Sequence, residues 1–204
     1  MITGDNKLSF KSGMRTLAHT VTSQAFHSFS TISSTSPVHY FEVRVLKMQD
    51  KEANKFGIGL SKKDFPYLRV VGGKESVGVR GDGKIFVNDI EEKNVLLGLL
   101  GGAIPGDKSI VNSVVGVGYE VRSAKVFFTL NGHEVFSVAS KTFDSSEVYP
   151  TFSMGSLDDK IHVNFGQTQF LFNIKAKINV SNSICSMLTK LGTGVLQENF
   201  HRDL

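Results

Sequence analysis

AKVFFTLNGHEVFSVA, residues 124–139, is the stretch of this sequence that decides its fold class. Two runs rich in β-branched and aromatic residues flank the pair Asn131-Gly132. Both central residues of a type I′ turn must accept a positive φ, which Asn and Gly tolerate, and this turn matches the twist of two paired antiparallel strands. The stretch therefore predicts a β-hairpin.

Short strand signals fill most of the chain around this hairpin. Residues 39–47, HYFEVRVLK, alternate apolar Phe41, Val43 and Val45 with charged residues, which is the period of a strand with one buried face. Similar runs, separated by Gly and Asn, occur at 56–61, 75–83, 84–89, 113–121, 149–154 and 160–166. Strands at this spacing predict a sandwich or a barrel of antiparallel strands.

The C-terminal part of the chain has a different pattern. Between residues 181 and 192 the apolar side chains fall at helical spacing, behind Ser181 and Ser183 as possible N-caps. We predict a short amphipathic helix there. It either packs back on the sheets, which we favour because so short a helix is marginal alone in water, or begins an interaction helix of a longer protein. The predicted organisation is an N-terminal extension at 1–14, a β-domain at 15–174 and a C-terminal extension at 175–204.

Composition excludes several classes of protein. The 204 residues are 40% hydrophobic and 21% charged, and the net charge of +4 is spread without a long basic run. These values describe an ordinary globular domain and do not call for a nucleic-acid partner. No apolar run approaches the ~18 residues of a membrane span, and no signal-peptide core opens the chain. With a single cysteine, Cys185, we expect no disulfide and a cytoplasmic or nuclear location.

Two motifs suggest functions that the surrounding residues argue against. GLLGGAIPGDKS, residues 98–109, resembles a phosphate-binding loop, but Asp107 separates Gly106 from Lys108. A P-loop needs Gly-Lys-Ser/Thr in succession and must open a helix, whereas β-branched residues follow here, so we expect no nucleotide and no other cofactor. The tripeptide at 80–82, RGD, is the one that integrins read on extracellular ligands. Here we interpret it as a strand end that runs into a Gly-rich turn.

Candidate catalytic residues are sparse. The six histidines do not fall at H-x-x-x-H or H-E-x-x-H spacing, and no G-x-S-x-G elbow occurs. Cys185 lies in the predicted helix, and the acidic pairs Asp158-Asp159 and Glu91-Glu92 lie in turn-like segments, where carboxylates are usually solvated. We expect neither a metal site nor an enzyme.

The order of the strand motifs resembles that of the SPRY domain, also called the B30.2 core, over residues 15–174. The motifs that carry the resemblance are YFEVRV, KFGIGLS, ESVGVRGDGKIF, GDKSIVNSVVGVGYEV, KVFFTLNGHEVFSVA, VYPTFSM and IHVNFGQTQFLFNI. Among SPRY domains, these motifs most resemble those of Ran-binding-protein-M-like proteins. The chain departs from this pattern at Gly72-Gly73, where relatives carry G-W, in having no Trp, and in a longer stretch at 108–113.

The resemblance implies a two-layer antiparallel β-sandwich without catalytic activity. Loops at one end would bind a short peptide or a folded protein, as an adaptor or as the substrate-recognition part of a ubiquitin-ligase or scaffold complex. By its own motifs this chain places two segments there, 67–74 and 154–157, and more loosely 21–24. The candidate partner-binding residues are Tyr67, Leu68, Arg69, Val70, Lys74, Met154, Gly155, Ser156, Leu157 and Gln24.

Each candidate has a structural alternative. Tyr67 could be a residue of the sandwich edge, Met154 a core residue and Arg69 a solvated loop charge. A carbohydrate-binding or glycoside-hydrolysing β-sandwich is the alternative function, which would need paired carboxylates across a cleft. The lack of Trp argues against it.

In a two-layer sandwich the apolar phase of each strand faces the interior, which predicts as core residues Phe41, Val43, Ile58, Val115, Val117, Phe127, Phe152 and Phe165.

Overall fold

The computed structural model of the protein describes residues 7–8, 19–22, 38–62, 65–66, 69–95, 110–139, 143, 148–156, 158–180 and 183. The chain divides into two compact units, Met1–Phe172 and Asn173–Leu204. All described strands lie in the first unit, and a short helix over residues 174–180 lies in the second. In the described part of the chain no helix is long and apolar enough to cross a membrane.

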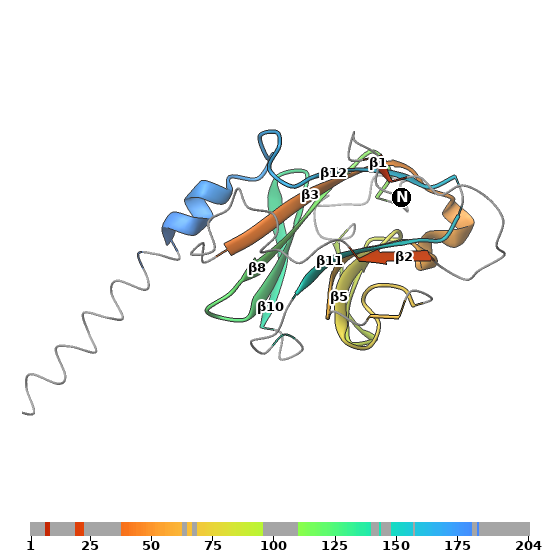
Figure 1. Ribbon diagram of the computed structural model, residues 1–204, viewed down its shortest axis with the longest axis horizontal. Coiled ribbons are helices and arrows are strands. Elements are labelled where there is room, and N and C mark those ends of the chain that lie inside the picture. The colour runs from red at the N-terminus through yellow and green to blue at the C-terminus, as the bar shows by residue number, and fades with distance from the viewer. Residues whose placement is uncertain are drawn as a thin grey trace, which may run out of the picture. The chain divides into compact units, whose positions relative to one another are not determined.

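The first unit is a sandwich of two antiparallel sheets, seen as two layers in Figure 1. Sheet A has the order β1-β12-β3-β8-β9-β10. Its strands are β1 (Lys7–Leu8), β12 (Lys160–Asn164), β3 (Val38–Lys47), β8 (Val114–Glu120), β9 (Lys125–Leu130) and β10 (His133–Ala139). The prediction of an all-β, two-layer antiparallel sandwich with a short C-terminal helix is confirmed.

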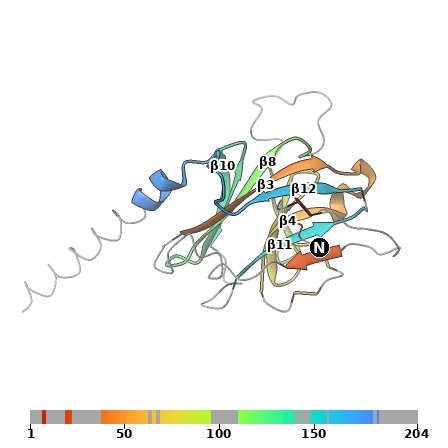
Figure 2. The ribbon, with the colours of Figure 1, turned by 45° about the horizontal axis from the view of Figure 1, so that its top comes forward.

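Sheet B has the order β2-β11-β4-β5-β6-β7, and Figure 2 shows its strands β4 and β11 in the layer below β12 and β3 of sheet A. Its strands are β2 (His19–Thr22), β11 (Tyr149–Met154), β4 (Gly57–Ser61), β5 (Ser76–Arg80), β6 (Lys84–Val87) and β7 (Ile90–Asn94). A 3-10 helix, η2 (Asp50–Lys55), joins β3 to β4. The edge strand β7 was not predicted, because its exposed Glu91, Glu92 and Lys93 give it no apolar alternation.

The hairpin of β9 and β10 forms as predicted. Asn131 and Gly132 have φ values of 49° and 83°, and His133 pairs with Leu130 directly across the turn. Asn131 also accepts a hydrogen bond from the backbone N–H of Val114 at 2.9 Å. The turn therefore ties the hairpin to the neighbouring strand β8.

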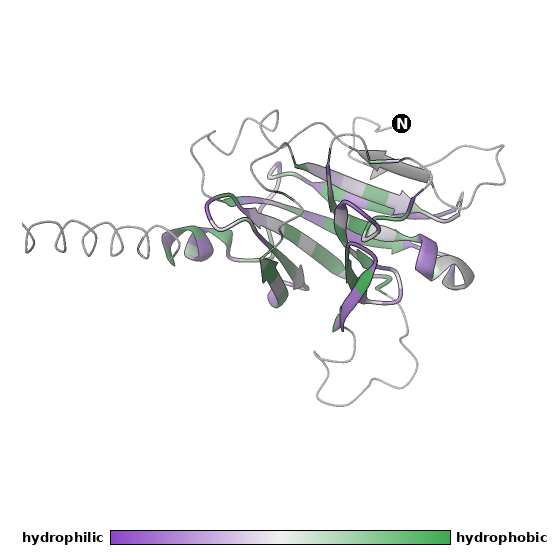
Figure 3. Ribbon diagram, turned by 90° about the horizontal axis from the view of Figure 1, so that it is seen from below, coloured by the Kyte–Doolittle hydropathy of each residue, from purple (hydrophilic) through white to green (hydrophobic). Residues whose placement is uncertain are grey.

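The interior between the sheets is filled by the inward phase of each strand, and Figure 3 shows the resulting bands of hydrophobic residues. All eight predicted core residues are buried. Seven of them belong to the cluster between the sheets: Phe41, Val43, Ile58, Val115, Val117, Phe152 and Phe165. Phe127 does not, because its neighbours Val126 and Phe128 hold the inward phase of β9.

Phe127 instead belongs to a second buried cluster on the outer face of sheet A. Its ring stacks on Tyr40 with centroids 5.9 Å apart, and Phe170 and Phe172 pack on Tyr40 at 4.9 and 5.5 Å. The segment after β12 thus covers this face. Gly118 stands opposite Phe127 in β8, where a side chain would collide with the ring.

A buried carboxylate anchors this cover. Glu42 in β3 is 5% exposed and accepts hydrogen bonds from the backbone N–H groups of Leu171 and Phe172, both at 3.0 Å. The hydroxyl of Tyr40 donates to the same carboxylate at 3.1 Å. Burial is the main cause that raises the pKa of this hydroxyl above its ordinary value.

The described helix of the second unit, residues 174–180, precedes the predicted helical stretch. Asn173 caps it, since its Oδ1 accepts the backbone N–H of Ala176 at 3.1 Å, as an N-cap residue does. The predicted helical stretch, 181–192, lies outside the described residues except for Ser183, whose hydroxyl donates to the carbonyl of Asn179 at 2.9 Å. The predicted boundaries at 14/15 and 174/175 stay predictions.

Candidate functional site

The outer face of sheet B is lined by glycines in its two central strands. Gly57 of β4 and Gly78 of β5 face outward, because Ile58 and Val77 next to them belong to the core. A Cβ on Gly57 would lie 2.6 Å from Val71 Cγ1, and a Cβ on Gly78 would lie 2.9 Å from the same atom. The missing side chains therefore leave room for Val71 to pack against the sheet.

Val71 belongs to residues 69–73, which cross the outer face of sheet B and are called the crossing segment below. Its backbone N–H donates to Ser153 Oγ of β11 at 2.9 Å, and the N–H of Gly72 donates to Ser76 Oγ at 2.8 Å. The carbonyl of Gly72 accepts the N–H of Asp89 at 2.9 Å. These bonds fix the crossing segment from β11 to the turn after β6.

The crossing segment explains how distant candidate residues meet. Ser61, at the end of β4, pairs with Tyr149 at the start of β11, whereas Ser153 pairs with Gly57 at the opposite end of these strands. The β4–β5 connection leaves the sheet at the first end and returns along the outer face. Arg69 and Val70 are thereby brought beside Ser153, which stands two residues before the predicted Gly155 in the chain.

The other candidate residues lie differently. Lys74 is exposed and stands beside the β6–β7 turn, where the N–H of Glu75 donates to Asn88 Oδ1 at 2.8 Å. The side chain of Met154 is 2% exposed and packs in the core, as the structural alternative for this residue expected. Tyr67, Leu68, Leu157 and Gln24 lie outside the described residues, as does the glycine-rich loop 98–109.

The turn after β11 is held by a buried carboxylate. Asp159 is fully buried and accepts the backbone N–H groups of Gly155 and Ser156 at 2.9 Å and of Gln49 at 3.1 Å. Burial raises the pKa of this carboxyl, and the three N–H donors oppose that shift. Gly155 and Ser156 are therefore presented, half-buried, on a turn with little freedom.

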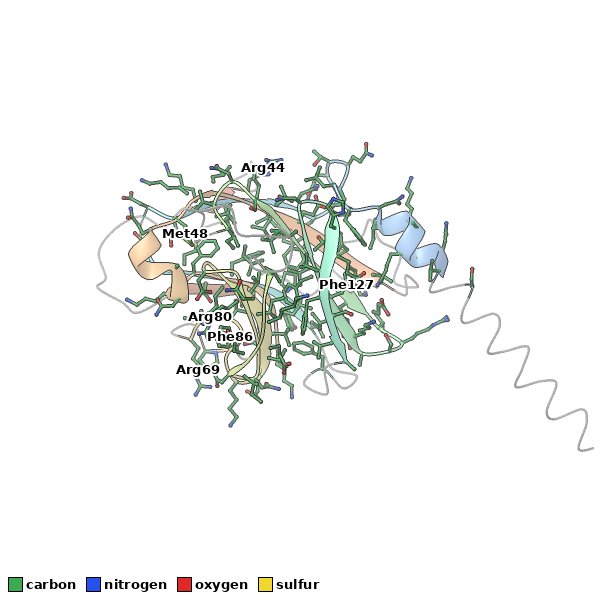
Figure 4. The ribbon with its side chains drawn as sticks, turned by 180° about the vertical axis from the view of Figure 1, so that it is seen from behind. Arg44, Met48, Arg69, Arg80, Phe86 and Phe127 are labelled. Atoms are coloured by element: carbon green, nitrogen blue, oxygen red, sulfur yellow. The ribbon has the colours of Figure 1, made fainter. Side chains whose placement is uncertain are left out.

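Arg80 and Phe86 complete this face. Arg80 ends β5 and Phe86 pairs with Gly78 across the strands, so both side chains point outward. The guanidinium carbon lies 3.7 Å from the centroid of the Phe86 ring, within the range of a cation–π interaction. Figure 4 shows Arg69, Arg80 and Phe86 on the same side of the sandwich, with Phe127 among other strands.

Burial lowers the pKa of Arg80, and the negative charges of Asp82, Asp89 and Glu91 oppose that shift. Arginine keeps its charge in proteins, so this face presents a fixed cation on an aromatic ring. The sequence analysis missed both residues of this pair. The strand pattern could have shown that both side chains face away from the core, because Arg80 and Phe86 alternate with the apolar residues Val79 and Ile85.

The face has no feature of a hydrolytic site in the described ranges. Among the described residues the buried carboxylates are Glu42, in β3 of sheet A, and Asp159, and each accepts hydrogen bonds from a different backbone segment. No group of three or more His, Cys, Asp or Glu side chains in these ranges could hold a metal ion. What the face offers is shape, apolar contact and charge.

Comparisons with known proteins agree with the motif order. The SPRY domain family matches residues 38–168. Among solved structures, a human SPRY domain superposes with a TM-score of 0.57 at 20% identity, covering 83% of this chain and 96% of that domain. The SPRY domain of human HERC1 gives 0.56 at 15% identity, covering 83% and 94%.

Relatives of known sequence include the fungal SSH4 proteins. Protein SSH4 of Coccidioides immitis is 31% identical over 155 residues, which cover 72% of this chain and 28% of that protein. Protein ssh4 of Sclerotinia sclerotiorum is 31% identical over 137 residues, which cover 66% of this chain and 24% of that protein. The chain therefore spans about a quarter of the length of these relatives.

Proposed function

The chain belongs to the SPRY domain family, and from that premise we propose that it recognises a protein or peptide through the outer face of sheet B. SPRY domains are generally noncatalytic protein-interaction modules. The proposed recognition face consists of Arg69, Val70, Arg80, Phe86 and the turn at 155–156. The observation that carries the proposal is the crossing segment, which gathers loop residues beside the end of β11.

The rigidity of this face supports its role in binding. The crossing segment is fixed to Ser153, Ser76 and Asp89 by hydrogen bonds of 2.8–2.9 Å, and Asp159 fixes the neighbouring turn. A surface that is ordered before binding loses little conformational entropy when the partner arrives. Residues with a charged or aromatic end, such as Arg69 and Phe86, supply the kind of contact that interfaces favour.

The test begins with capture of the partner. The full chain is immobilised, exposed to a lysate, and the bound proteins are identified by mass spectrometry. The partner is then titrated by calorimetry against the chain, Arg69→Glu and Arg44→Glu. Arg44 is an exposed arginine of β3 in sheet A, so it gives the same change of charge on the other layer.

We expect Arg69→Glu to weaken binding about tenfold and Arg44→Glu to leave it unchanged. Equal effects of the two variants would contradict the proposed face. Tyr67→Ala tests the neighbouring predicted residue in the same titration, with an expected loss of about 1 to 3 kcal/mol.

We further propose that the chain acts as the substrate-recognition part of a ubiquitin-ligase or scaffold complex in the cytoplasm or nucleus. Its support is the resemblance of the strand motifs to Ran-binding-protein-M-like domains, and that resemblance stays a prediction. The same capture tests this role, because ligase subunits should appear in the mass spectrum together with a substrate. A partner captured without any such subunit would contradict it.

A further inference from the structure

The guanidinium of Arg80 lies on the Phe86 ring but makes no polar contact within the described part of the sandwich. It donates no hydrogen bond to a described residue and forms no ion pair with one. Its Nε is buried without a partner among these residues, whereas the two Nη nitrogens are not among the buried unpartnered atoms. The terminal edge of the guanidinium therefore faces solvent while its flat side lies on Phe86.

Two of the three carboxylates near Arg80 have other partners. Asp82 Oδ1 accepts the backbone N–H of Lys84 at 3.1 Å, and Glu91 Oε2 pairs with Lys84 Nζ at 2.9 Å. These groups and Asp89 act on Arg80 through their charge, without contact. The N–H donors on the outer edge of the Arg80 guanidinium thus form no ion pair with Asp82, Asp89 or Glu91.

We infer that Arg80 receives the carboxylate of one acidic residue in the partner, and that apolar neighbours of that residue lie on Phe86 and Val70. This inference rests on the proposed function of the face. A planar guanidinium matches a carboxylate through two parallel hydrogen bonds, and such charge-assisted bonds are stronger where water is partly excluded. Phe86 holds the guanidinium in one plane, which reduces the freedom lost on pairing.

The surrounding charges restrict the kind of acidic segment that fits. Asp82, Asp89 and Glu91 surround Arg80, and they would repel further acidic residues beside the one that pairs. Val70 and Phe86 are half-buried and apolar, so they favour apolar flanking residues. The preferred ligand is therefore a single Asp or Glu between apolar residues, not an acidic run.

The experiment selects peptides from a random phage-displayed library against the full chain and three variants: Arg80→Gln, Arg69→Glu and Arg44→Gln. Thermal melts first confirm that each variant is folded, and Arg80→Lys replaces Arg80→Gln if the latter melts early. We expect the unmodified chain and Arg44→Gln to enrich peptides with one acidic residue between apolar ones. Selection on Arg80→Gln should lose that enrichment.

A double-mutant cycle then measures the pairing with a selected peptide. Replacing its acidic residue by the amide should weaken binding to the unmodified chain by about tenfold or more, and to Arg80→Gln by less than about twofold. Peptides that depend on Arg69 but keep the same acidic preference with Arg80→Gln would overturn this inference and leave the proposed face standing. Peptides that are indifferent to both arginines would overturn the proposed face as well.

Discussion

The packing of Val71 into the glycine-lined face of sheet B can be tested by adding one methyl group. In Gly78→Ala the new Cβ would lie 2.9 Å from Val71 Cγ1 and 3.2 Å from both the nitrogen of Gly72 and the carbonyl oxygen of Ile58. Overpacking of this kind costs about 1–3 kcal/mol. Alanine in place of glycine within a strand returns about 0.5–1 kcal/mol, so from the middle of the two ranges we expect a net loss of about 1 kcal/mol in the free energy of unfolding.

A second substitution identifies the clashing group. Val71 is fully buried, and Val71→Ala alone should cost about 2–3 kcal/mol through lost burial and the cavity. In the double variant the methyl group added by Gly78→Ala fills part of the space that the valine side chain leaves, so the combined loss should be smaller than the sum of the separate losses. Chemical denaturation of the four proteins measures this. Additive losses would refute the direct contact between Val71 and Gly78.

Three further predictions concern the sandwich itself. Phe127→Ala should cost about 3–5 kcal/mol of folding free energy in denaturation experiments. The ring lies outside the core between the sheets, but it is buried and packs against Phe172. A loss below about 1 kcal/mol would contradict the second buried cluster. Glu42→Gln turns an amide donor toward one of the two N–H groups, of Leu171 or Phe172, that the carboxylate accepts, so it should cost about 1–3 kcal/mol and lower hydrogen-exchange protection of at least one of these amides; unchanged protection of both would argue against the anchor. Because the pKa of Asp159 is raised in the folded chain, the folded chain binds the carboxyl proton more tightly than the unfolded chain does. The contribution of Asp159 to the free energy of unfolding therefore falls as the pH rises from the ordinary pKa of 3.8 through the raised pKa of the folded chain. The stability of the chain relative to Asp159→Asn should therefore decline over that interval in melts at a series of pH values, and a rising difference would contradict the shift.

Local patterns were sufficient to predict most strands, though not β1, β2 and β7, and they did not show what covers the sheets. The Asn131-Gly132 hairpin follows from residues that touch one another along the chain, and the strand at 149–154 was predicted with its observed bounds. Phe127 was assigned to the wrong face, because alternation separates two faces without showing that residues 170–172 cover the second one. The helix at 174–180 was not predicted, because N-caps were sought at Ser181 and Ser183 and not at Asn173.

The candidate site was predictable only in part, for a similar reason. Arg69 and Val70 were named from the motif order, but their place beside Ser153 depends on a connection that returns along the sheet. That return is possible because Gly57 and Gly78 face the same side, which the period of two in β4 and β5 already encodes. Arg80 and Phe86 were missed because a pair on adjacent strands becomes visible only when the register is known.

Amide hydrogen exchange of the full chain, with and without the captured partner, tests the recognition face most directly. We expect the partner to slow exchange in the crossing segment, at residues 80–86 and at residues 153–156, where backbone groups lie under or beside the proposed contact. We expect no change at residues 125–129 on the outer face of sheet A. Slowed exchange confined to sheet A, with the crossing segment unaffected, would contradict the assignment of the recognition face to the outer side of sheet B.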